Sequence, residues 1–113
     1  MTTTTAAVRE ITPKECESRW GVPPGDITLL DVREAWEVAT AHVAGSIHMS
    51  MNQVPSRLAE LDPKARLLVM CHGGMRSLQV AQYLADQGFA DVYNLSGGID
   101  AWSQEVDPGV PRY

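Results

Sequence analysis

One short segment combines a cysteine, two glycines and an arginine, and these residue types together can perform nucleophilic chemistry. Residues 71–77 read Cys-His-Gly-Gly-Met-Arg-Ser. They follow the uninterrupted apolar run 67–70, which is typical of a strand buried on both faces of a parallel sheet. After Ser77, apolar residues recur with a helical period to about Gly88. The segment is therefore expected to form a loop between the carboxyl end of a strand and the start of a helix.

A cysteine in that position is expected to be reactive. Free backbone N–H groups and the dipole at a helix start attract negative charge, which favours a thiolate at Cys71. Gly73 and Gly74 would let the chain curl so that successive N–H groups form an anion-binding nest. A sulfur at the rim of such a nest can act as a nucleophile and then hold an anionic adduct. The alternative is a buried core cysteine beside an ordinary turn.

Four segments of the chain resemble the rhodanese homology domain. They occur in that family's order and spacing and together cover nearly the whole chain. Any one of them would be weak evidence, whereas four in register are strong evidence. Ala44 departs from the family, which usually has proline there, and this difference concerns the rigidity of a turn. The segments are residues 29–34 (LLDVRE), 42–47 (HVAGSI), 71–77 (CHGGMRS) and 95–102 (LSGGIDAW).

The resemblance implies that Cys71 is the catalytic residue and carries sulfane sulfur as a persulfide. It would take sulfur from thiosulfate or a persulfide donor and pass it to a thiophilic acceptor: cyanide in an assay, a thiol or protein group in the cell. Backbone N–H groups of the loop would stabilise the anionic terminal sulfur. No cofactor and no metal are expected. The expected substrate-binding residues are His72, Gly73, Gly74, Met75, Arg76 and Ser77.

The spacing between Cys71 and Arg76 bears on which chemical group the loop can hold. Four residues separate the two, whereas protein tyrosine phosphatases place five residues between cysteine and arginine. The shorter loop makes a smaller bowl, which fits a terminal sulfur atom better than a phosphoryl group, so a phosphatase-like enzyme is the less favoured alternative. Arg76 either adds positive charge at the rim or points outward and serves packing or partner binding.

The donor is expected to be a persulfide. Thiosulfate is a dianion, and the loop offers it only Arg76 on an acidic protein, so electrostatic steering of a small anion should be weak. We therefore hypothesise that the physiological donor is a protein persulfide or a low-molecular-weight persulfide.

Other polar residues are assigned supporting roles. Asp31 and Arg33 are interpreted as a structural ion pair that holds neighbouring loops. His42 and His48 lack the close spacing of a structural metal site. The ring of His72 should point away from the sulfur and shape the rim or receive a partner. The three tryptophans Trp20, Trp36 and Trp102 are expected in helix–sheet packing, and Gly97-Gly98 in a tight turn into a helix.

Composition limits the class of protein. The chain has 113 residues, enough for one domain, so a tandem rhodanese is excluded. With 14 acidic and 9 basic residues the net charge is −5, which argues against nucleic acid or a membrane as a partner. The start lacks a signal-peptide pattern, so a cytoplasmic location is expected, with Cys16 and Cys71 reduced. The expected partners are a small sulfur donor or protein persulfide and a possible sulfur-carrier protein as acceptor.

The order of elements predicts an α/β fold: a rhodanese-like three-layer domain with a central parallel sheet of about five strands and helices on both faces. Ligands of such sheets bind outside the carboxyl ends of the strands. Residues 1–6 are expected to be a flexible terminus and residues 7–113 the domain. Strands are predicted at 8–11, 27–32, 46–49, 67–70 and 92–95, and helices at 12–20, 34–41, 55–61, after 77 and 98–104.

Two further possibilities stay open. Residues 102–113 resemble the tail of rhodanese domains fused behind adenylating enzymes of the molybdopterin and thiamine sulfur-carrier pathways. The chain would then be either an excised domain or a stand-alone relative. A non-catalytic binding or sensor module with the same fold is the other alternative, although such modules commonly lose the loop cysteine.

Overall fold

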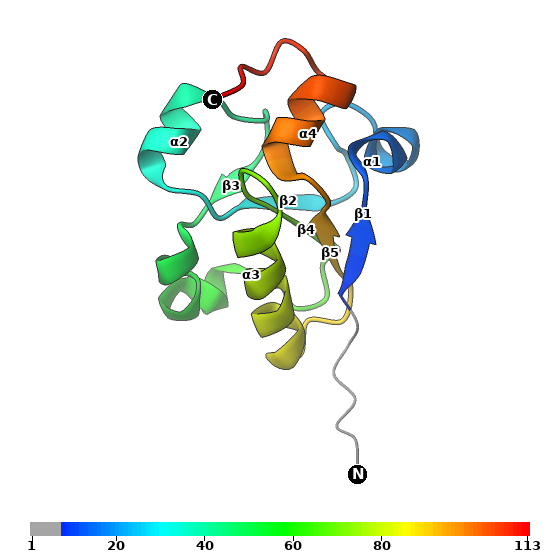
Figure 1. Cartoon of the computed structure of the whole chain (residues 1–113). Coiled ribbons are helices and arrows are strands. Elements are labelled where there is room, and N and C mark those ends of the chain that lie inside the picture. The colour runs from blue at the N-terminus through cyan, green and yellow to red at the C-terminus, as the bar shows by residue number, and fades with distance from the viewer. Residues whose placement is uncertain (1–7) are drawn as a thin grey trace.

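The fold is built on a five-stranded sheet in which every neighbouring pair of strands is parallel. The structure is a computed structural model that describes residues 8–113; the expected flexible terminus, residues 1–6, lies outside the described residues. The strand order is β1-β5-β4-β2-β3, and helices cover both faces (Figure 1). The predicted α/β class is therefore confirmed. The strands are β1 (Arg9–Ile11), β2 (Thr28–Asp31), β3 (Ile47–His48), β4 (Leu67–Met70) and β5 (Val92–Leu95).

The helices lie where the sequence pattern predicts them, with one change of type. In α1 (Pro13–Trp20), Thr12 and Glu15 form a capping box. The helix predicted at 55–61 is instead the 3₁₀ helix η2 (Pro55–Glu60), preceded by a short 3₁₀ turn, η1 (Met51–Gln53). Short connecting segments commonly use the tighter i→i+3 bonding. The other helices are α2 (Ala35–Thr40), α3 (Met75–Asp86) and α4 (Gly98–Glu105).

Two apolar layers pack on opposite faces of the sheet. Strand β4 is buried throughout, and its residues alternate between the layers: Leu67 and Val69 face one, Leu68 and Met70 the other. The first layer packs against α3, and the second against α1 and α4. Cys71 continues the alternation and belongs to the α3 layer, whereas Cys16 of α1 belongs to the second. None of the helices described between residues 8 and 113 has the length and apolarity needed to cross a membrane.

Candidate active site

Cys71 lies at the carboxyl edge of the sheet, directly after β4 and four residues before α3. Asp31 ends the neighbouring strand β2, and α4 begins three residues after β5, so three strand ends converge there. This is the edge at which open parallel sheets bind ligands. The cysteine is only 1% exposed. Any reactant therefore has only narrow access to its sulfur.

The backbone of the loop directs a hydrogen-bond donor at the sulfur. The N–H group of Gly74 donates to Cys71 Sγ at 3.1 Å, and Gly74 has a left-handed φ of 106° that favours glycine. Gly73 differs from expectation, because it is exposed, has no positive φ and leaves open space for a Cβ atom. Only Gly74 of the glycine pair is required by the conformation of the loop.

The start of α4 holds the outer side of the loop. The N–H groups of Ile99 and Asp100 donate to the carbonyls of Cys71 (2.9 Å) and His72 (3.1 Å). These carbonyls are thus turned away from the bowl. Gly98 makes the approach possible, because a Cβ atom there would lie 2.4 Å from Cys71 O and 2.3 Å from His72 O. Gly98 therefore does more than permit a tight turn into α4.

A chain of buried polar groups lies behind the sulfur. The Ser77 hydroxyl is 3.2 Å from Cys71 Sγ and 2.6 Å from Asn94 Oδ1. Asn94 Nδ2 donates to Glu10 and to the Gly74 carbonyl, each at 3.1 Å, which fixes its Oδ1 toward Ser77. Since Ser77 has one proton, it can accept from the S–H group while donating to Asn94, or turn its proton toward a charged sulfur. Two protonation states of Cys71 can thus be accommodated without moving the backbone.

Arg76 is held by a residue of another helix. Its two terminal nitrogens donate to the two carboxylate oxygens of Glu37 at 2.7 and 2.9 Å. Glu37 is 4% exposed, and the Arg76 side chain is 36% exposed. Hydrogen bonds from Arg76 hold the pKa of the Glu37 carboxyl at about 2, well below its ordinary value of 4.5. The pair raises the pKa of Arg76 in turn.

The expected structural pair Asp31 and Arg33 is fully buried and lies beside this carboxylate. Two nitrogens of Arg33 donate to the two Asp31 oxygens at 2.9 and 2.6 Å. Arg33 also donates to the carbonyls of Glu37 and Ala41, which fastens α2 to the end of β2. The Arg33 nitrogen that donates to the Glu37 carbonyl, Nη1, also donates to the hydroxyl of Tyr113 at 2.8 Å.

Aromatic and apolar side chains form the rim. The His72 ring packs against Tyr113 with centroids 4.4 Å apart, and Tyr113 packs against Trp36 at 5.9 Å. The end of the described chain accordingly lies beside α2 (Figure 1). Trp36 is 64% exposed and Met75 is 74% exposed, so the predicted packing role is wrong for Trp36. Trp102 is buried, and Trp20 packs edge-on against Tyr93.

The other candidate nucleophile is in a different environment. Cys16 is fully buried in the second apolar layer, and burial raises the pKa of its thiol to about 11. Both cysteines are free thiols.

The histidines do not form a metal site within the described residues. His48 bonds to the Arg33 carbonyl at 2.7 Å, and residues 8–113 contain no group of three or more His, Cys, Asp or Glu side chains placed to hold a metal ion.

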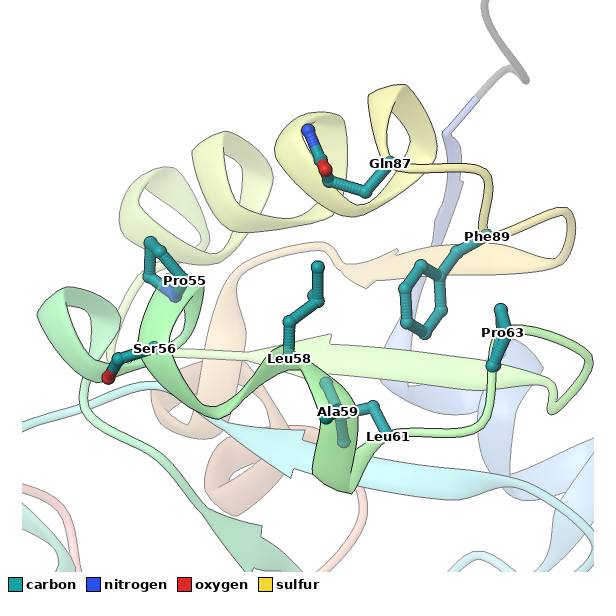
Figure 2. A pocket seen from close by; sticks show the side chains of 8 residues that line it. All are labelled: Pro55, Ser56, Leu58, Ala59, Leu61, Pro63, Gln87 and Phe89. Atoms are coloured by element: carbon teal, nitrogen blue, oxygen red, sulfur yellow. The ribbon is translucent and has the colours of Figure 1, made fainter.

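An apolar pocket of about 570 Å³ lies away from the sulfur. It opens between η2 and the far end of α3, with Leu58 and Phe89 projecting into it (Figure 2). Since α3 starts at the loop and has 12 residues, its length of about 18 Å separates the pocket from Cys71. None of the residues that line it belongs to the loop. The lining residues are Pro55, Ser56, Leu58, Ala59, Leu61, Pro63, Gln87 and Phe89.

Four residues of the site are not among those predicted from the sequence: Glu10, Glu37, Asn94 and Tyr113. Asn94 carries a signal, because a lone amide in the apolar run Val92–Leu95 must find partners when the strand is buried. Glu10 then follows from the register of β1 with β5, which pairs it with Asn94. Glu37 and Tyr113 carry no such signal, since their contacts with Arg76 and Arg33 join distant segments.

Comparison with known proteins places the chain in a family. Residues 12–105 match the model of the rhodanese-like domain. The chain is 39% identical over 83 residues to the putative sulfurtransferase YtwF of Bacillus subtilis, covering 74% of this chain and 80% of that one. It is 38% identical over 77 residues to the thiosulfate sulfurtransferase GlpE of Coxiella burnetii, covering 68% and 72%. The chain belongs to the rhodanese-like domain family.

Larger proteins and solved structures extend the comparison. The chain is 38% identical over 112 residues to the Arabidopsis thaliana chloroplastic rhodanese-like/PpiC domain-containing protein 12. The match covers 94% of this chain but only 38% of the length of that protein. The crystal structure of a rhodanese-like domain protein from Staphylococcus aureus superposes with a TM-score of 0.79 at 26% identity, covering 94% of this chain and 99% of that one.

Proposed function

We propose that this chain is a sulfurtransferase in which Cys71 carries the sulfur as a persulfide. The Cys71 thiolate attacks the outer sulfur of thiosulfate or of a persulfide; a new S–S bond forms, the donor's S–S bond breaks, and sulfite or the donor thiol leaves. The terminal sulfur then passes to a nucleophilic acceptor, which regenerates the thiolate. With cyanide the product is thiocyanate, so no electrons are gained or lost overall.

One observation carries the proposal: the donation from Gly74 N–H to Sγ at 3.1 Å, in a loop whose outer carbonyls are bound by α4. The first N–H groups of α3 are also without partners inside that helix. These donors would stabilise negative charge on the carried sulfur, as an oxyanion hole does for oxygen. The names of two relatives as sulfurtransferases support the same chemistry.

The acceptor is proposed to be a small thiol or a sulfur-carrier protein, which the resemblance of residues 102–113 suggests. The Tyr113 end of that segment lies at the rim of the loop, against His72. A carrier protein that approaches Cys71 would therefore contact this segment.

The test is turnover with cyanide combined with intact mass measurement. After incubation with thiosulfate or an organic persulfide, the protein should gain the mass of one sulfur atom and lose it to cyanide as thiocyanate. Cys71→Ala should abolish both observations, and Cys16→Ala should leave both in place. Failure to gain sulfur from either donor would contradict the proposal and favour a binding module, whereas hydrolysis of a phosphate ester would favour a phosphatase.

A further inference from the structure

The arginine of the Cys71 loop is already neutralised by another residue of the protein. Arg76 is the one arginine of the loop 71–77, which contains no lysine. Its guanidinium makes the two-point pair with Glu37, using the same fork of N–H groups that would grip a bound oxyanion. A donor that needs this fork must displace a buried carboxylate.

Glu37 cannot easily give way, because two further groups donate to its carboxylate and a third group holds one of those two. The Tyr113 hydroxyl donates to Oε2 at 2.8 Å, and the backbone N–H of Glu34 donates to Oε1 at 3.0 Å. Burial raises the pKa of the Tyr113 phenol to about 12, so that hydroxyl keeps its proton at neutral pH. Arg33, itself buried and bound to Asp31, donates to the same hydroxyl. The position of the carboxylate is thus set by a network that extends back into β2.

The surroundings do not restore the missing positive charge. Arg33 is paired with Asp31, and Arg112 is paired with Asp100 at 2.8 Å. The chain as a whole carries a net charge of −5. A dianion that approaches Cys71 therefore meets paired charges in an acidic protein and gains little from steering.

What the rim does offer is apolar surface. Trp36 precedes Glu37 and Met75 precedes Arg76 in the sequence, and both are largely exposed. Exposed aromatic and thioether groups stabilise a ligand by burying its carbon atoms. An inorganic anion has none to bury, whereas an organic persulfide does.

We infer that Glu37 determines the class of sulfur donor: by holding the Arg76 guanidinium it selects organic persulfides over small dianions such as thiosulfate. The organic part of the donor lies against Trp36 and Met75 while its outer sulfur meets Cys71. The Cys71–sulfur bond forms as the donor's S–S bond breaks and its thiol leaves. This inference rests on the proposed sulfur transfer at Cys71.

The test compares the rate constants for forming the Cys71 persulfide from thiosulfate and from benzyl persulfide, whose organic part is uncharged. In the native chain, benzyl persulfide should react faster. Glu37→Gln frees Arg76 and should raise the thiosulfate constant about tenfold relative to the benzyl persulfide constant. The gain should shrink as salt is raised, because it is electrostatic.

Two controls isolate the cause. The double variant Glu37→Gln/Arg76→Gln should lose the gain if the freed guanidinium produces it. Glu17→Gln, on the exposed surface of α1, makes the same change in net charge and should leave both constants as they are. An unchanged donor ratio in a folded Glu37→Gln protein, or faster reaction of the native chain with thiosulfate, would overturn the inference.

A second variant covers the case in which Glu37→Gln fails to fold. Met75→Ser alters a side chain that is 74% exposed, and it should lower the benzyl persulfide constant about threefold relative to the thiosulfate constant. Equal effects on both donors would contradict selection at the rim. Absence of any Cys71 persulfide from either donor would instead contradict the proposed function, so the two failures are distinguishable.

Discussion

The two cysteines are almost equally buried, at 0% exposure for Cys16 and 1% for Cys71, yet their surroundings are opposite. Cys16 lies within α1 in an apolar layer, and burial raises the pKa of its thiol to about 11. Cys71 lies where a strand ends and a helix begins, with an N–H group and a hydroxyl directed at its sulfur. Burial alone therefore makes a thiol inert, whereas burial beside fixed donors equips it to carry charged sulfur.

Apart from loss of Cys71 itself, the largest expected effect comes from pushing the Cys71 loop away from α4. In Gly98→Ala the new Cβ atom would collide with the carbonyls of Cys71 and His72. A loop displaced by about 1 Å is expected to lower the rate of persulfide formation about a hundredfold, measured by quenched intact mass.

Gly88→Ala is the matched control for Gly98→Ala. Gly88 also has a positive φ, of 96°, but a Cβ atom there meets nothing within 4 Å. It should lose about 1 kcal/mol of stability and keep its rate. Equal rates in Gly98→Ala and Gly88→Ala would show that the contact with α4 does not matter.

A smaller effect is expected from the hydroxyl behind the sulfur. Ser77→Ala removes one hydrogen bond at Cys71 and leaves Asn94 Oδ1 without its donor. Losing one such bond in the reaction should slow persulfide formation about tenfold. Ser103→Ala removes a buried serine that donates to the Val110 carbonyl instead, so it should reduce the free energy of unfolding without changing the rate. If both variants reacted at the native rate, Ser77 would have only a structural role.

The smallest effect on sulfur transfer is expected at Cys16. Cys16→Ala should leave the rate of persulfide formation within about twofold of the native value, because this thiol lies in the other layer. Alkylation of Cys16 in the folded protein should be slow at neutral pH and accelerate only as the pH approaches 11. The raised pKa stabilises the folded state below about pH 9, and this contribution is lost as the pH rises to about 11. Alkylation is measured by mass spectrometry, and rapid alkylation of Cys16 at pH 7 would contradict the buried environment assigned to this thiol.

The features that the sequence predicts well depend on neighbouring residues. The strand before Cys71 and the helix after it both follow from local spacing, and the structure confirms them. The α-helix predicted at 55–61 is wrong in type, because a short connecting segment can bond at i→i+3 instead of i→i+4.

Features that depend on contacts between distant segments are not predictable in this way. The role of Gly98 arises from its approach to the backbone carbonyls of Cys71 and His72 in the loop after β4. His72 lies 26 residues before Gly98 in the sequence. The pairing of Arg76 with Glu37 spans 39 positions in the sequence. The exposed position of Trp36 likewise depends on how α2 docks beside Tyr113, and the helical pattern alone does not reveal it.

The most direct test of the account is to locate the sulfur within the native chain. The protein is incubated with thiosulfate and, separately, with benzyl persulfide; free thiols are blocked, and peptides containing Cys16 and Cys71 are compared by mass spectrometry. We predict that the added sulfur atom lies on Cys71 alone, with Cys16 recovered as an unmodified thiol after unfolding. Sulfur on Cys16, or on both cysteines equally, would contradict the claim that fixed donors at the strand end make Cys71 the sulfur carrier.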